Sequence, residues 1–74
     1  MKANYKKLWF QLIDRKMKKT ELAQLAGIHI SIFSKMNRKE FVSMNTLARI
    51  CLVLDCDIGD IVSFEKEPGD WKPL

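Results

Sequence analysis

Side chains able to act as nucleophiles, bases or metal ligands are few in this sequence. The single histidine, His29, has no Asp, Glu, Cys or Ser cluster at a spacing that suggests a base with its nucleophile. Cys51 and Cys56 are five residues apart, which does not place them on one face of a helix, and no Cys-x-x-Cys or His-x₃-His zinc pattern occurs. The sequence therefore predicts no catalysis, metal site, disulfide or cofactor. We interpret Cys51 as a small core residue and Cys56 as a loop thiol in a reducing compartment.

Basic side chains, by contrast, are numerous and concentrated in the first half of the chain. Residues 1–39 hold ten basic and two acidic side chains, a net charge of +8, whereas residues 40–74 hold three basic and seven acidic ones, a net charge of −4. Such an asymmetry directs a polyanion to one part of the molecule and away from the rest. The charge pattern therefore favours a polyanionic partner.

The length and composition describe one small domain. The chain has 74 residues, of which 47% are apolar. No apolar run approaches the roughly 18 residues that a membrane span needs, and the N-terminus lacks the features of a signal peptide. We therefore expect a cytoplasmic protein without a membrane segment. Residues 1–64 are predicted to form the domain, and residues 65–74, which contain Pro68, Gly69 and Pro73, a C-terminal tail.

Two helices are predicted in the first part of the chain. After Asn4 as N-cap, apolar residues at helical spacing line one face of the first: Tyr5, Leu8, Trp9, Leu12 and Ile13. The second begins at about Lys19 and ends at Gly27, the residue type best suited to a sharp turn. Its apolar residues are Leu22, Ala23, Leu25 and Ala26.

Three more helices are predicted in the second part. The third spans about residues 30–38, with Phe33 and Met36 pointing inward. The fourth begins at Ser43 as N-cap, and its apolar stripe comprises Leu47, Ile50, Cys51 and Leu54. A short fifth helix is capped by Asp57 with Asp60 three residues on, and it carries Ile58, Ile61 and Val62. Strand evidence is thin, because no run alternates long enough.

Residues 17–38 have the spacing of a helix-turn-helix. Ala23 is small where a second helix must cross close above it, and Gly27 permits the positive φ that turns the chain. Four apolar side chains fix the angle between the two helices: Leu22, Ile28, Phe33 and Met36. The second helix can then protrude into a DNA major groove, which is about 12 Å wide.

With these motifs the sequence resembles the Cro and phage-repressor (XRE-like) helix-turn-helix regulators over about residues 5–64. The resemblance is carried by the motif at residues 20–28 (TELAQLAGI), by Ser34-Lys35-Met36, by Asn45-Thr46-Leu47 and by residues 56–61 (CDIGDI). It implies an all-α, compact five-helix lambda-repressor-like domain that binds double-stranded DNA and represses or activates transcription in bacteria, their phages or mobile elements. Of these two roles we favour the repressor. Lys18 and His29 stand where the family usually has Ser or Thr as helix caps.

The family positions imply which residues meet DNA. Three side chains are expected at base edges: Ile30, Ser31 and Lys35. Seven are expected at the phosphate backbone: Lys19, His29, Ser34, Arg38, Lys39, Ser43 and Asn45. Other roles stay open, since His29 and Ser43 can be helix caps, and Ile30 and Ile32 can belong to the core.

Two protein partners are also considered. A single recognition helix contacts few base pairs, and two-fold pairing doubles the site. We therefore expect a weak homodimer through the end of the fifth helix and the tail, using Phe64 and Trp71. The alternative function is a protein-interaction module, antitoxin-like or an adaptor, with a patch of Ile30, Ile32, Phe41 and Val42. The charge of residues 1–39 argues against that alternative.

Overall fold

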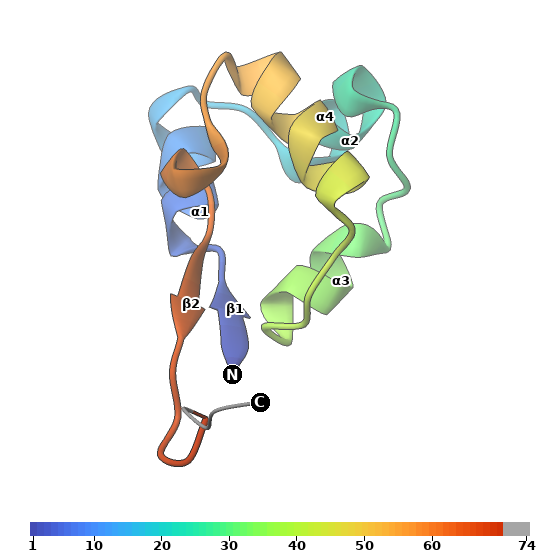
Figure 1. The fold of residues 1–74 in the computed structure, drawn as a ribbon. Helices are drawn as coiled ribbons and strands as arrows, with labels where there is room; N and C mark the ends of the chain where they lie inside the picture. Colours follow the sequence, from blue (N-terminus) through green and yellow to red (C-terminus); the bar gives the residue numbers. More distant parts are fainter. Residues whose placement is uncertain (71–74) are drawn as a thin grey trace.

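The computed structural model describes residues 1–70 and contains four α-helices, a single 3₁₀ turn and two short strands (Figure 1). The elements, in chain order, are β1 (Lys2–Asn4), α1 (Lys6–Asp14), α2 (Lys19–Ala26), α3 (Ile32–Asn37), α4 (Met44–Leu54), the 3₁₀ turn η1 (Ile58–Asp60) and β2 (Ser63–Glu65). In Figure 1, α1 and the strand pair form one side of the molecule and α2, α3 and α4 the other. Trp71 lies outside the described residues.

The helix starts follow local capping chemistry. The Asn4 side chain accepts a hydrogen bond from the Lys6 backbone N–H at 2.8 Å, although Tyr5 occupies the cap position of α1. Ser43 Oγ accepts from the Thr46 N–H at 3.1 Å, as predicted for the N-cap of α4. At the start of α2 the backbone N–H of Lys18 donates to the Glu21 carboxylate at 3.4 Å.

The predicted fifth helix is wrong, because residues 58–60 form one 3₁₀ turn. Its predicted caps are present, since Asp57 accepts from Ile58 N–H and Asp60 accepts from Asp57 N–H. An α-helix would continue by bonding the next carbonyls to later N–H groups. Here α1 side chains take those carbonyls: Lys7 donates to the Gly59 oxygen at 3.0 Å and Gln11 to the Asp60 oxygen at 2.9 Å. The chain then leaves as a strand.

That strand, β2, pairs with β1 in an antiparallel two-stranded sheet. Lys2 lies opposite Glu65, Ala3 opposite Phe64, and Asn4 opposite Ser63. The fold is therefore mostly helical rather than all-α. Strands of three residues carry too little alternation to be recognised, and the two partners are about 60 residues apart in the chain. Regular structure also extends to Glu65, one residue beyond the predicted domain boundary at 64.

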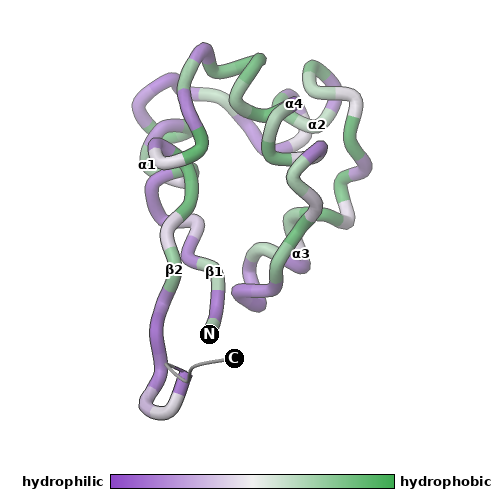
Figure 2. Tube along the Cα trace, in the orientation of Figure 1, coloured by the Kyte–Doolittle hydropathy of each residue, from purple (hydrophilic) through white to green (hydrophobic). Residues whose placement is uncertain are grey.

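The core takes apolar side chains from the helices, β1 and the segment after η1. Six large ones are essentially inaccessible: Leu8, Leu22, Met36, Ile50, Leu54 and Ile61. Two residues predicted on core stripes are instead exposed, Ile13 by 70% and Leu25 by 63%. Both flank a buried line of side chains, so the real stripe is narrower than the apolar pattern. Figure 2 shows the apolar residues in the helical part, whereas the chain beyond β2 is hydrophilic.

No helix within residues 1–70 is both long enough and apolar enough to span a bilayer.

Candidate nucleic-acid interface

The turn between α2 and α3 has the predicted geometry. Gly27 has φ 68° and ψ 37°, the left-handed conformation that glycine adopts without steric cost. The Ile28 N–H donates to the Ala23 oxygen at 3.0 Å, and Arg49 from α4 reaches the Ala26 oxygen at 3.5 Å. Because α4 also packs against α2, the first helix of the motif is fixed to the rest of the domain. One side of α3 stays exposed to solvent.

The third helix starts two residues later than predicted and ends one earlier, at Ile32–Asn37. The preceding residues form tight i to i+3 turns, in which Ile32, Phe33 and Ser34 N–H groups donate to the oxygens of residues 29, 30 and 31. His29 Nδ1 accepts the Ser31 N–H at 3.1 Å and lies 2.8 Å from Ser31 Oγ. This ring thus satisfies the backbone N–H of Ser31, the N-cap residue of α3, while no side chain caps the first turn of the helix. Ile30 and Ser31 lie in the entry turn.

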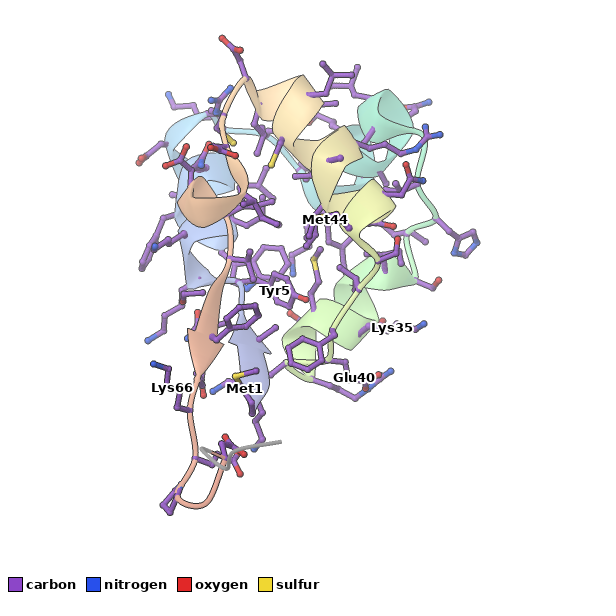
Figure 3. The ribbon with its side chains drawn as sticks, in the orientation of Figure 1. Met1, Tyr5, Lys35, Glu40, Met44 and Lys66 are labelled. Carbon is purple, nitrogen blue, oxygen red and sulfur yellow. The ribbon has the colours of Figure 1, made fainter. Side chains whose placement is uncertain are left out.

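The residues predicted at base edges share the exposed side of this segment. Ile30 is 45% exposed, and Ser31 and Lys35 are exposed, one helical turn apart. Phe33 and Met36 point the other way and are 3% and 2% exposed. Figure 3 shows Lys35 projecting outward from α3. Of the two isoleucines, Ile32 is half-buried against the core and Ile30 is not.

Lys19, the first residue of α2, is held by an aromatic ring. Its ammonium lies 4.3 Å from the centroid of the Trp9 ring, a cation–π arrangement. The Trp9 ring is in turn 6.1 Å from the Phe33 ring of α3. Trp9 therefore connects a candidate phosphate-binding cation to the recognition helix. The sequence placed Trp9 only on a core stripe, because nothing local signals a contact across ten residues.

Arg38 and Lys39 already have carboxylate partners. Arg38 Nε pairs with the Glu40 carboxylate. Lys39 Nζ lies 2.8 Å from Glu65 Oε2, and hydrogen bonds from Lys39 and then Asn4 hold the pKa of Glu65 below its ordinary value. Among the ion pairs of residues 1–70, Lys19 and Lys35 take part in none. The sequence prediction assigned Lys19, Arg38 and Lys39 alike to the phosphate backbone and did not distinguish paired from unpaired cations.

The loop that follows α3 is tied to the opposite side of the molecule. The Ala3 N–H donates to the Lys39 oxygen at 3.1 Å, and the Tyr5 hydroxyl donates to the Glu40 oxygen at 2.7 Å. Lys39 itself has φ 60°, a left-handed conformation that is unusual for lysine. The N-terminal strand therefore fixes where the recognition helix exits. Glu40 is a loop neighbour of these cations in the sequence, whereas no local spacing indicates the role of Glu65.

Three polar candidates lie on α3 and at the start of α4. Ser34 is exposed on α3, and Asn45 is exposed in the first turn of α4. Ser43 accepts the Thr46 N–H, and its own hydroxyl donates to Thr46 Oγ1 at 3.0 Å. Its hydroxyl is therefore engaged in capping.

Within residues 1–70 the structure contains no group of three His, Cys, Asp or Glu side chains arranged to hold a metal ion. Burial, followed by the neighbouring Cys56 sulfur, raises the pKa of the Cys51 thiol to about 11.

Comparison with known proteins places this arrangement in a family. Residues 7–67 match the Cro/C1-type HTH DNA-binding domain. The uncharacterized HTH-type transcriptional regulator YozG of Bacillus subtilis is 34% identical over 58 residues, which cover 76% of this chain and 69% of YozG. The crystal structure of the transcriptional regulator VanUg superposes with a TM-score of 0.78 at 47% identity, covering 84% of this chain and 83% of that one. The chain therefore belongs to the Cro/C1-type helix-turn-helix DNA-binding domain family.

Proposed function

We propose that this protein represses transcription by inserting α3 and its entry turn into the major groove of double-stranded DNA. The observation that carries the proposal is the division of this segment into two sides: Phe33 and Met36 are buried, while Ser31 and Lys35 are exposed one turn apart. Lys35 donates to guanine O6 or N7, Ser31 donates or accepts, and Ile30 contacts a thymine methyl. The function is binding, without catalysis.

The phosphate backbone is contacted on both sides of this segment. Lys19 stands beside the N-terminal amides of α2, where the helix dipole also favours an anion. Ser34 and Asn45 supply neutral hydrogen-bonding groups on α3 and at the start of α4, and His29 adds an imidazole at the helix entry. Ser43 contributes only by exchanging its Thr46 partner for phosphate. Neutral groups position the protein on DNA but release no counterions, so Lys19 and Lys35 dominate the salt dependence.

Arg38 and Lys39 contact phosphate only by exchanging partners. Each exposed carboxylate, Glu40 or Glu65, competes with the phosphate for its cation. Exposed ion pairs contribute only about 0–1 kcal/mol, so phosphate can replace the carboxylate. The net gain in DNA-binding free energy is nevertheless smaller than for an unpaired lysine.

The experiment is a selection from random duplexes with the full chain, followed by titration of the selected site against salt. We expect enrichment of a defined site and a log–log salt dependence with negative slope. Equal binding to selected and scrambled duplexes would contradict sequence reading. Failure to bind any duplex at low salt would favour the protein-interaction alternative, for which Ile30 and Phe41, 45% and 55% exposed, offer apolar contacts.

We also propose a weak homodimer formed on DNA through the β2 end and the tail, residues 65–74. Phe64 is 62% exposed and packs edge-on against Phe41, with ring centroids 6.0 Å apart, so the pair presents an aromatic surface. Trp71, the second predicted contact, lies outside the described residues. Sedimentation with and without the selected duplex tests this, comparing the parent with Phe64→Ser and with a chain cut after Glu65. A monomer bound to a non-repeated site in all three would end the idea.

A further inference from the structure

The two cysteines meet at the end of α4. The helix ends at Leu54, and Asp55 takes the left-handed conformation with φ 51°. The Cys56 N–H then donates to the Cys51 oxygen at 3.1 Å. This bond defines a common helix ending, in which the chain folds back over its last turn and the side chains of these two positions frequently lie against each other.

A spacing of five places residues 51 and 56 on different faces of an uninterrupted helix, but α4 ends at Leu54, before Cys56. Cys56 is therefore a loop residue, as predicted. The left-handed Asp55 reverses the chain so that both residues line one surface pocket, and after burial the Cys56 sulfur contributes to the raised pKa of Cys51. Both residues are free thiols in this structure.

The pair is reachable from solvent. Both cysteines are half-buried and line one surface pocket with Met44, Leu52 and Asp57. Leu52 is 82% exposed, so the mouth of the pocket is open. Gln11 of α1 lies on the inner side, with Nε2 3.9 Å from Cys56 Sγ.

We propose that Cys51 and Cys56 are a reversible dithiol–disulfide site that reacts with small-molecule disulfides. Oxidation fastens the last turn of α4 to the segment before η1, and reduction releases it. The site is separate from α3, and the inference does not rest on the proposed function.

The reaction proceeds in two exchanges. Cys56, whose sulfur faces the Gln11 amide donor, loses its proton to water and attacks one sulfur of the reagent. A mixed disulfide forms and one reagent thiolate leaves. The Cys51 sulfur, after losing its proton, then attacks the Cys56 sulfur, forming the intrachain bond and expelling the second thiolate. Two protein thiols are oxidised by two electrons, and one reagent disulfide is reduced to two thiols.

The pocket chemistry sets the order and the preferred reagent. Burial raises the pKa of Cys51 to about 11, so its thiolate is scarce at neutral pH and Cys56 attacks first. A thiol of that pKa exchanges about tenfold more slowly at neutral pH than an ordinary cysteine, because scarcity of thiolate outweighs its higher nucleophilicity. Asp55 and Asp57 line the pocket, which favours a cationic disulfide such as cystamine over anionic oxidised glutathione.

The test treats the full chain with cystamine or oxidised glutathione at neutral pH and follows intact mass and thiol titre. We expect a monomer that loses both thiols and the mass of two hydrogen atoms, faster with cystamine, with a higher melting temperature that dithiothreitol reverses. Cys51→Ala should stop at a mixed disulfide on Cys56, and Cys56→Ala should react more slowly than Cys51→Ala, because burial, the largest cause of the raised pKa of Cys51, is still present. Affinity for the selected duplex, where one exists, should change by less than about twofold on oxidation, because the sites share no partners.

Three results would overturn the proposal. These are a stable mixed disulfide on the parent chain, disulfide-linked dimers as the main product, or two free thiols after prolonged excess reagent. The parent measurements decide the matter even if an alanine variant fails to fold.

Discussion

The segment from the start of α2 to Lys35, called the entry side, and the exit at Arg38 and Lys39 differ in how their charges are held. On the entry side, Lys19 rests on an aromatic ring and Lys35, in the last turn of α3, is exposed, and neither is among the ion pairs of the described chain. At the exit, Arg38 and Lys39 are bound to Glu40 and Glu65. Of these four cations within twenty-one residues, two are therefore paired with carboxylates and two are not. Net charge along the sequence describes where a polyanion is attracted, but not which cation is available to it.

The two regions are also anchored differently. The entry depends on the local turn at Gly27 and on the His29 ring, both set by neighbouring residues. The exit depends on Ala3 and Tyr5, which lie over thirty residues away in the chain. Local perturbation should thus damage the entry, and perturbation of the strand pair should damage the exit.

The largest effect is expected from Gly27→Val, which breaks the turn that presents the entry. A β-branched residue at φ 68° is strained by about 1–3 kcal/mol. Thermal unfolding should show the midpoint falling by about 4–8 °C for each kcal/mol lost. Gly59→Ala is the matched control, because a Cβ there meets no atom within 4 Å. Equal midpoints for Gly27→Val and the parent would show that the turn is unstrained.

Lys35→Ala tests whether the exposed cation on α3 reads bases. Losing a base-edge contact should cost about 1–3 kcal/mol on the selected site, or about 5–150-fold in affinity, with much less loss on scrambled DNA. Lys16→Asn is the control, because Lys16 is exposed in the turn after α1 and its φ of 53° suits asparagine, and it should change neither affinity. If Lys35→Ala weakens binding to the selected and the scrambled duplex equally, Lys35 contacts phosphate and does not read a base.

The salt dependence compares the entry with the exit directly. Lys19→Ala should reduce the magnitude of the negative slope of log affinity against log salt by about one. Lys39→Ala should reduce this magnitude by less, since Glu65 already neutralises that lysine. Glu65→Gln should increase the magnitude of the slope, because Lys39 without its carboxylate partner is available to phosphate. Equal reductions by Lys19→Ala and Lys39→Ala, with no change in Glu65→Gln, would show that the internal pair does not compete with phosphate.

The smallest effect concerns acid stability at the exit. Hydrogen bonds from Lys39 and Asn4 lower the pKa of Glu65 from its ordinary 4.5. A carboxyl with a depressed folded pKa contributes stability fully above the unfolded value, and the contribution is lost as pH falls through the folded value. The free energy of unfolding, measured with urea, should therefore fall more steeply as pH decreases below 5 for the parent than for Glu65→Gln. Parallel profiles of unfolding free energy against pH would mean that Lys39 and Asn4 do not hold the Glu65 carboxylate in solution.

Local chemistry explains why much of the motif was predictable. The positive φ of Gly27, the Ser43 cap and the burial of Phe33 and Met36 depend on residue type and helical spacing, and all four are confirmed. The base-contacting and phosphate-contacting roles remain predictions. What failed had non-local causes, as with the fifth helix, whose carbonyls are taken by Lys7 and Gln11 of α1.

The sequence by itself determined the helix-turn-helix, its family and the polarity of the charge, because these depend on spacing and composition within short windows. Only the tertiary structure decided which cations are free. Glu65 reaches Lys39 after the β1–β2 pairing has closed a loop of about 60 residues, and the left-handed Asp55 brings Cys56 back onto Cys51. A side chain's partner depends on where the folded backbone places it, and no spacing rule encodes a contact formed by chain reversal or by distant strands.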